Sequence, residues 1–224
     1  MVRIAAVAIA CLVTVLAAVA KDVQIGPTTI NLTLPSAYCE LDDGNAEDAS
    51  LLKVMGDLPA RSHLLAAYAD CKQLTGFRSG KETVPSDFAI YATPAGAMNI
   101  VFPDLTVKQV CAKLRTEGEQ TLAGLWRENR LRVEGIIKGI KFNEMQFLGV
   151  MAEESSVCYG ASLVKLKTDV GTEKVEVSLF ANTIIRGKFI IFSLYAPYVG
   201  IDTVPAMLSK HKSNVATLTA ANKN

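Results

Sequence analysis

The sequence predicts an α+β domain built as an α/β/α sandwich, in which helices cover both faces of a mainly antiparallel sheet. One observation is a β-hairpin over residues 174–198, which turns at Arg186-Gly187. Its first arm alternates apolar and polar side chains, a period of two that places one face on a core. Its second arm, residues 189–196, is apolar or small at every position, so both of its faces must be covered. A strand of that kind requires helices on both sides of its sheet.

The N-terminal part of the domain is predicted to hold a strand, an acidic turn and a short helix. Residues 30–34 alternate apolar and polar side chains, which predicts a half-buried strand that Pro35 ends. Five carboxylates then crowd into residues 40–48, ELDDGNAED. Their spacing does not fit an EF-hand calcium loop, so we expect a turn that leads into a helix whose first turn favours acidic residues. That helix has an apolar face and stops at Pro59: Leu51, Leu52, Met55 and Leu58.

Residues 64–68 and 87–91 are predicted as the next two strands. Between them, residues 76–82 read GFRSGKE and superficially resemble a phosphate-binding loop. One residue too few separates the two glycines, and Glu82 stands where a Ser or Thr would have to bind the metal. This segment is therefore predicted to be a turn, and no cofactor is expected.

A long helix is predicted to begin at Thr106. Thr106 and Gln109 have the spacing of a capping box, in which the side chain of each residue accepts a hydrogen bond from the backbone N–H of the other. Gly118 lies on the apolar face of this helix, which indicates close approach to the sheet. Basic side chains gather beside Trp126 and beyond it: Arg127, Arg130, Arg132, Lys138 and Lys141. Glu128 and Glu134 dilute this cluster, which favours a solvated face over a phosphate-binding surface.

The C-terminal third is predicted to complete the sheet and to cover it. Residues 142–151 and 157–167 are two more strands, and the second feeds the hairpin to make a three-stranded meander. Asp202 or Thr203 caps a final helix, in which Pro205 is tolerated within the first turn. The buried stripe of that helix consists of Val204, Met207, Leu208, Val215 and Leu218.

The first twenty residues predict a secretory signal peptide. One Arg precedes an uncharged run over residues 4–20, which ends in Ala18-Val19-Ala20. Small residues at these positions favour cleavage after Ala20 and leave residues 21–224 as a single α+β domain in the periplasm or outside the cell. The alternative is an uncleaved membrane anchor, for which the run is slightly short. Beyond this segment there is no strong membrane signal.

Composition restricts the partners of the chain. Lys and Arg number 23 and Asp and Glu number 22, so no overall field recruits nucleic acid or an anionic membrane. Apolar residues make up 50% of the sequence, enough for one substantial core, and no linker or repeat divides it. The expected partner is a protein or a small ligand.

Four cysteines remain after the signal peptide, and in an oxidising compartment they permit three pairings. A β-α-β crossover would bring Cys39 and Cys71 to the same sheet edge, which favours that pair. Cys111 lies on the buried face of the long helix and Cys158 begins a strand, a contact that the layered fold allows. The alternative for this second pair is two buried thiols.

Motifs of catalysis and metal binding are missing from the sequence. It has no G-x-S-x-G elbow, no H-E-x-x-H and no C-x-x-C, and its two histidines are His63 and His211. His211 falls on the apolar stripe of the last helix, which favours a core position over a catalytic one. We therefore nominate no catalytic, cofactor-binding or metal-binding residue.

Three stretches carry a resemblance to a known family: INLTLPSAYC at 30–39, HLLAAYADC at 63–71 and FIIFSLYAPYVG at 189–200. Together with the order of elements, they resemble PsbP-like exported proteins of proteobacteria. The resemblance implies a PsbP-like α/β/α sandwich with a binding or accessory role, and it carries over no functional residue. The expected function is therefore non-enzymatic binding in the periplasm. The alternatives are a hydrolase whose site is assembled from sequence-distant residues, or an envelope-associated structural protein.

Overall fold

A computed structural model describes residues 20–57, 62–82, 84–136, 140–168 and 171–223. The predicted signal peptide lies outside the described residues except for Ala20. Leu58, Pro59 and Lys138 also lie outside them. None of the helices in the described ranges is long and apolar enough to cross a membrane.

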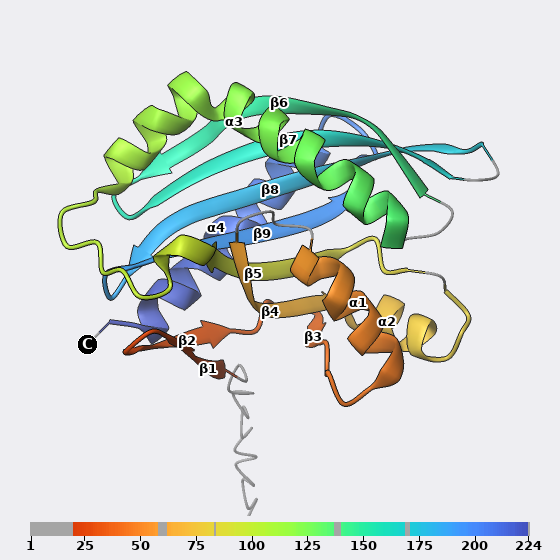
Figure 1. Cartoon of the computed structure of the whole chain (residues 1–224), viewed down its shortest axis with the longest axis horizontal. Coiled ribbons are helices and arrows are strands. Elements are labelled where there is room, and N and C mark those ends of the chain that lie inside the picture. Colours follow the sequence, from red (N-terminus) through yellow and green to blue (C-terminus); the bar gives the residue numbers. More distant parts are fainter. Residues whose placement is uncertain (1–19, 58–61, 83, 137–139, 169–170, 224) are drawn as a thin grey trace, which may run out of the picture.

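A seven-stranded antiparallel sheet forms the centre of the molecule (Figure 1). Its strands lie in the order β3 (Tyr38–Glu40), β4 (Ser62–Asp70), β5 (Phe88–Pro94), β9 (Lys188–Pro197), β8 (Glu173–Ile185), β7 (Val157–Thr168) and β6 (Ile140–Glu154). Every neighbouring pair is antiparallel. The last four strands follow one another along the chain, so the meander has four strands where the sequence predicts three.

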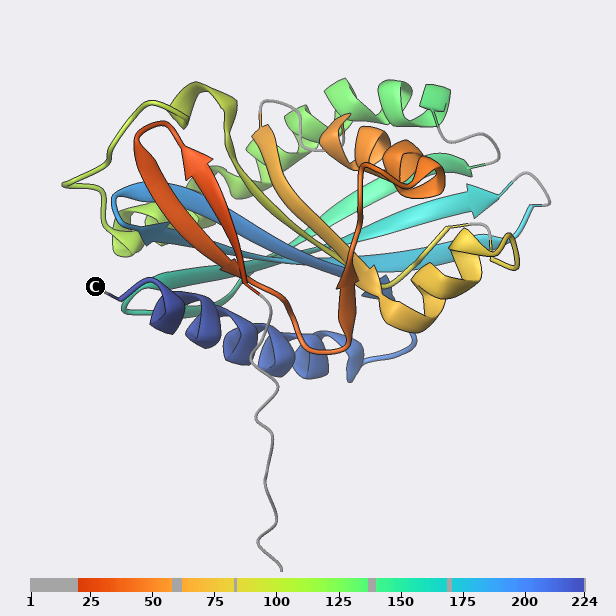
Figure 2. The ribbon, with the colours of Figure 1, turned by 90° about the horizontal axis from the view of Figure 1, so that it is seen from below.

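Helices cover both faces of this sheet, and Figure 2 shows the layers edge-on. Helix α4 (Thr203–Ala221) lies on one face, beside the two-stranded hairpin of β1 (Ala20–Ile25) and β2 (Thr28–Thr33). Helices α3 (Val107–Ile136) and α1 (Ala46–Asp57) lie on the other. The short helix α2 (Cys71–Arg78) follows β4 and packs beside α1, and a 3-10 turn, Ala95–Ala97, follows β5. The α+β sandwich predicted from the sequence is confirmed.

Alternation along β4 shows how the two cores are separated. Ala66 and Tyr68 join the cluster beneath α4 and the β1–β2 hairpin, whereas Ala67 and Ala69 join the cluster beneath α1 and α2. Tyr68 meets Tyr91 edge-on, and Tyr91 stacks on Phe192 with 4.1 Å between ring centroids. The two faces of one strand therefore bury side chains into different clusters, as a sheet between helices requires.

The hairpin of β8 and β9 turns where the sequence places it. Arg186 and Gly187 both have positive φ, 49° and 74°, the backbone that a two-residue hairpin turn needs. Lys188, the next residue, is fully buried. Its ammonium donates to the carbonyls of Met98 and Ile100 at 3.0 and 2.9 Å, so a buried cation binds the β5–α3 loop to the sheet.

The predicted start of α3 and the role of its glycine are confirmed. Gln109 N donates to the Thr106 hydroxyl at 3.3 Å, and Thr106 N donates back to the Gln109 side chain at 2.8 Å. A Cβ added at Gly118 would lie 2.8 Å from the ring of Phe147 on β6, so only glycine lets the helix come this close.

Three elements differ from the sequence prediction. Strands β1 and β3 were not predicted, and α2 occupies part of the segment predicted as a turn, because Gly76 to Arg78 form its last turn. Asp70 caps α2 by accepting from Lys72 N and Gln73 N. The predicted β-α-β crossover is wrong as well. Its first strand corresponds to β2, which pairs with β1 in a separate two-stranded sheet, and β3, the actual neighbour of β4, is antiparallel to it.

Candidate binding groove at the free edge of the sheet

The outer edge of β4 is only partly covered. Strand β3 pairs with its last three residues, from Tyr38 opposite Asp70 to Glu40 opposite Tyr68. One further bond, from Leu41 N to Ala67 O at 3.0 Å, ends the ladder. Within the ranges that the structure describes, no strand pairs with residues 62–66 on this side. Their outward-pointing backbone groups form an open sheet edge.

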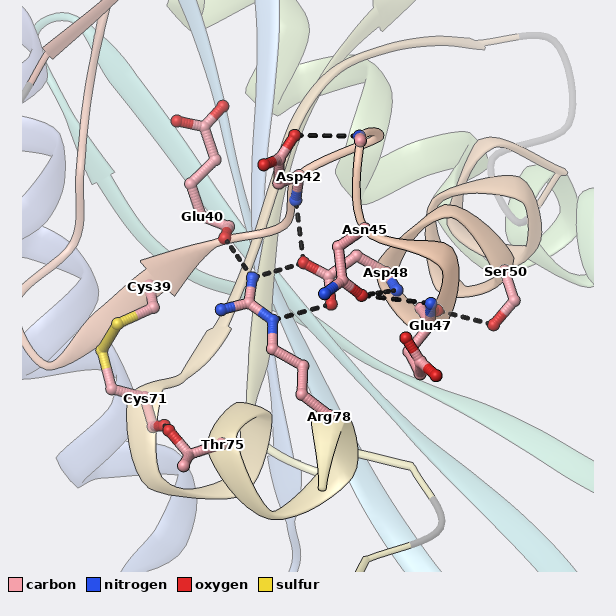
Figure 3. Close-up of polar contacts among 11 residues, drawn as sticks. Cys39, Glu40, Asp42, Asn45, Glu47, Asp48, Ser50, Cys71, Thr75 and Arg78 are labelled. Atoms are coloured by element: carbon pink, nitrogen blue, oxygen red, sulfur yellow. Dashed lines mark hydrogen bonds and ion pairs between the residues drawn. A yellow bond between two sulfur atoms is a disulfide. The ribbon is translucent and has the colours of Figure 1, made fainter. Parts of the chain in front are cut away.

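Strand β3 ends after three residues because the acidic loop turns the chain away (Figure 3). Asp42 Oδ1 accepts from Gly44 N at 2.9 Å, which closes a tight turn. Asn45 Oδ1 then accepts from Glu47 N and Asp48 N, and so caps α1. The loop is therefore built by its own polar side chains, in the manner of Asx turns.

Asp48 anchors this loop from inside the protein. Its side chain is fully buried and receives the Arg78 guanidinium, whose Nε lies 3.0 Å from Oδ1 and whose second donor reaches Oδ2. Asp42 N donates to the same carboxylate at 2.9 Å. Burial opposes ionisation of Asp48, but these donors outweigh it and hold its pKa below the ordinary value. The segment that would otherwise have continued along β4 is thus fixed against α2.

A groove of about 490 Å³ lies beside the open edge. Its apolar lining, which we call the floor, consists of Leu41, Leu52, Leu64, Leu65, Ala66 and Ala67. Charged side chains line its rim: Lys21, Glu40, Asp42 and Asp43. The Lys21 ammonium bonds to Glu40. Three carboxylates outnumber the Lys21 side-chain ammonium, and they still outnumber the two cationic groups of Lys21 in a chain that begins there, so this rim has a net negative charge.

A bulge at Leu65 shapes the groove. The register with β5 steps from Leu64 opposite Ala92 to Ala66 opposite Tyr91, which leaves Leu65 as the extra residue. Leu64 joins the cluster on the α1 side and Leu65 the cluster on the α4 side, yet both line the groove. The bulge places Leu65 and Ala66 on the same side of β4, where alternation would have separated them, and both line the groove.

The opposite edge of the sheet is protected in a different way. Strand β6 pairs with β7 through three register shifts, and α3 packs against it. Bulges and a covering helix are common means of preventing a strand edge from pairing with another chain. The open part of β4 carries one such register shift, between Leu64 and Ala66, but the groove lies beside it where the long helix α3 lies beside β6.

Strand β3 is fixed at its other end by two contacts. The Tyr38 hydroxyl donates to Asp87 and accepts from the Lys210 ammonium at 3.2 Å, and burial and Asp87 raise the pKa of Tyr38. Cys39 forms a disulfide with Cys71, the first residue of α2, with 4.9 Å between the Cα atoms. The position of β3 along β4 is therefore set by side chains on both sides of it.

The second disulfide joins Cys111 on α3 to Cys158 on β7, with 5.4 Å between the Cα atoms. Both cysteines are fully buried beside Val107. The sequence favours the first of these pairings and allows the second.

The structure also places the other residues considered from the sequence. In the described part of the chain, no group of three His, Cys, Asp or Glu side chains could hold a metal ion. Trp126 packs edge-on against Phe142, and Arg130 lies 3.9 Å from Glu134 within the basic cluster. Arg132 and Lys138 have side chains outside the described set.

The two histidines lie in different environments. His63 is exposed on β4, at the outer end of the open edge. His211 is fully buried, its Nε2 lies 2.9 Å from the Phe192 carbonyl, and its ring meets the rings of Tyr159 and Phe192. Because a carbonyl only accepts, Nε2 carries the proton of a neutral imidazole. Burial lowers the pKa of His211 to about 4.

Glu176 is a perturbed carboxyl that the sequence analysis did not single out. It lies on β8 between Val164 of β7 and Pro197 of β9. Burial raises its pKa to about 7, although Lys174 opposes the shift. Glu176 belongs to the polar half of the alternation in β8, and the sequence pattern does not show that this position is half-buried in the folded protein.

Comparison with known proteins finds two solved structures with a weakly similar fold and low sequence identity. No family model and no curated protein matches the chain. The Ran-binding protein Mog1p of Saccharomyces cerevisiae matches 92% of this chain and 93% of its own at 11% identity, with a TM-score of 0.36. Cyanobacterial PsbP (CyanoP) of Synechocystis sp. matches 90% of this chain and 94% of its own at 12% identity, with a TM-score of 0.35. At this similarity, neither protein carries its function over to this chain.

Proposed function

We propose that this chain is an exported, non-enzymatic accessory protein that binds a segment of another polypeptide in the groove beside β4. The observation that carries the proposal is the open edge of residues 62–66 above a leucine-lined floor. Backbone groups on such an edge hydrogen-bond to any polypeptide, while apolar side chains and a charged rim select among sequences. A small polar ligand could hydrogen-bond to the edge but would leave the leucines without an apolar partner.

Two features support the exported location. The two disulfides are of the kind that persists in an oxidising compartment. Cleavage after Ala20 removes a single residue of β1 and leaves the pairs from Lys21 with Leu32 to Ile25 with Thr28. The hairpin that covers one core is therefore retained in the cleaved chain. N-terminal sequencing of the protein from its host should begin at Lys21, and a chain that begins at Met1 in the membrane fraction overturns export and release.

Site-specific crosslinking tests the binding proposal. A photo-crosslinking amino acid at Asp43, on the groove rim, should yield a discrete polypeptide adduct in living cells. The same amino acid at Thr217, exposed on α4 and on the other face of the sheet, is the matched control. We expect the adduct at Asp43 and not at Thr217, with mass spectrometry mapping it to one segment of the partner. Equal labelling at both positions contradicts a binding groove.

A further inference from the structure

We infer that the groove binds an extended polypeptide segment by strand addition, antiparallel to residues 62–66 of β4, with Lys or Arg at the N-terminal end of the segment. The inference rests on the proposed function and names its ligand class. It concerns the geometry of binding, which the sheet register and the charges around the groove determine.

The length of the open edge of β4 is consistent with strand addition. Strand β3 and the added segment would lie in the same row, one after the other, along the outer side of β4. The ladder of β3 ends at the bond from Leu41 N to Ala67 O. Five residues of β4 remain, which extend over about 17 Å and match the usual length of a strand.

Orientation follows from β3. As β3 runs from Tyr38 to Glu40, its partners on β4 run from Asp70 back to Tyr68. A segment that is also antiparallel to β4 starts beside Ala66, where β3 ends, and runs toward Ser62. Its N-terminal end therefore lies next to the acidic loop. A parallel segment would place its C-terminal end there.

Charge selects between these two orientations. Glu40, Asp42 and Asp43 line the groove at the end of β3. They face the Lys21 side chain and, in the chain that begins at Lys21, its α-ammonium, so the carboxylates still outnumber the cationic groups by one. For a segment at the terminus of its chain, a basic N-terminal end with its free amino group is attracted to these carboxylates, whereas the terminal carboxylate of a parallel segment would be repelled. The attraction acts through partly exposed groups and weakens with salt.

The floor selects the side chains that follow. Leu52 and Leu64 belong to the same cluster on the α1 side of β4. Side chains of an added strand point alternately to the two faces, so every second residue of the segment meets these leucines. Branched apolar residues at alternate positions suit this surface.

The first experiment measures orientation by charge. Two nine-residue peptides, with two lysines or two glutamates followed by alternating valine and threonine, are titrated into the chain from Lys21 onward at low ionic strength. We expect binding of the lysine peptide about tenfold tighter than that of the glutamate peptide. Asp42→Asn with Asp43→Asn should remove most of this difference, and the asparagine at 42 keeps the acceptor for Gly44 N. Glu117→Gln with Glu119→Gln, exposed on α3, should leave it unchanged.

The second experiment tests strand addition itself. Backbone N-methylation at alternate residues of the lysine peptide gives two sets, of which only one removes the donors that face β4. We expect one set to lose binding by more than about tenfold and the other to retain it, since only one edge of the peptide pairs with β4. Hydrogen exchange of the complex should slow at amides within residues 62–66 and not on β6.

The outcomes separate the two proposals. If both N-methylated sets bind equally well and binding still depends on Asp43, strand addition is contradicted. The proposal that the groove binds a polypeptide is then retained. Preference for the glutamate peptide contradicts the charge requirement, and a preference for the lysine peptide that survives Asp42→Asn with Asp43→Asn contradicts the orientation. If no peptide binds more tightly than about 1 mM while the crosslink at Asp43 maps to a folded surface, the extended segment is wrong. If the crosslink is absent as well, both proposals fail.

Discussion

Arg78 and Asp48, thirty residues apart in sequence, form a two-pronged ion pair that determines where the sheet edge opens. Asp48 is fully buried, while about a third of the Arg78 side chain meets solvent. The same guanidinium donates to the Glu40 carbonyl at 3.3 Å. One cation therefore fixes the end of β3, the start of α1 and the end of α2 relative to one another.

Replacement of Arg78 by methionine should destabilise the protein strongly. It leaves the buried Asp48 carboxylate without its cation, and such a loss costs about 3 kcal/mol in the free energy of unfolding. Urea unfolding at neutral pH measures this change. The control is Asp48→Asn with Arg78→Met, which removes both charges and should recover more than half of the loss. A double variant as unstable as Arg78→Met alone would show that the pair acts by packing and not by charge.

Parts of the sheet could be predicted where the local sequence pattern alone specifies the structure that the folded protein adopts. Alternation in β8, the apolar run of β9 and the turn at Arg186-Gly187 specify the hairpin within the sequence itself. The capping box of Thr106 likewise marks the start of α3. These signals need no partner from elsewhere in the chain.

The missed elements depend on partners distant in sequence. Helix α2 has eight residues, too few to be stable alone, and it forms because Leu74 is buried and Asp70 caps it. Strand β3 has three residues and exists only through its pairing with β4. The groove was missed for the same reason, since it depends on where β3 stops. The Arg78–Asp48 contact that stops it has no local sequence pattern.

Replacement of Glu176 by glutamine should raise stability at alkaline pH. The folded-state pKa is about 7 against an ordinary 4.5, so the folded protein holds more protons than the unfolded chain between these values. Stability of the native protein therefore falls as pH rises from about 4.5 to about 7 and stays lower above it. Glutamine removes this loss, worth about 2 kcal/mol once partial solvent contact is considered.

Thermal melts of both proteins at about pH 4.5 and about pH 8 give the measurement. The two proteins should melt alike at the lower pH, and Glu176→Gln should melt higher at the upper one. Glu173→Gln, an exposed residue of the same strand, is the matched control and should show no such difference. A higher melting temperature for Glu176→Gln at both pH values would contradict a titration effect.

His211 should make stability rise with pH in the acidic range, the opposite of the effect of Glu176. Burial holds its pKa near 4, below the 6.5 of the unfolded chain, despite the bond to the Phe192 carbonyl. The unfolded chain therefore binds the extra proton, and stability falls as pH drops from about 6.5 to about 4, by about 3 kcal/mol. His211→Gln retains a donor for Phe192 and should flatten this part of the profile. His63→Gln, at an exposed site, should leave it unchanged, and an equal effect of the two substitutions would contradict the assignment.

The disulfide between Cys39 and Cys71 connects stability to the groove. It spans 32 residues and joins β3 to the first residue of α2. In the chain-entropy model, closing a loop of this length restricts the unfolded chain and contributes about 4 kcal/mol. Cys39→Ser, Cys71→Ser and the double variant should therefore lose similar, non-additive amounts of stability in urea. The bridge Cys111–Cys158, which spans 47 residues, should contribute about as much by the same reasoning.

Peptide mapping under non-reducing conditions decides whether these bridges form in the protein. We expect linked peptides for Cys39 with Cys71 and for Cys111 with Cys158, and no alkylation of native protein without reductant.

Loss of the first bridge should also lower the affinity for the lysine peptide, because the bridge helps to hold β3 and the acidic loop in place beside the groove. The matched control is Cys111→Ser with Cys158→Ser, which removes the bridge under α3, away from β4. This variant should be less stable. At temperatures where it stays folded, its affinity for the lysine peptide should be unchanged. Alkylation of Cys39 in native oxidised protein would contradict the first bridge, and equal loss of peptide affinity in both double variants would contradict its local role.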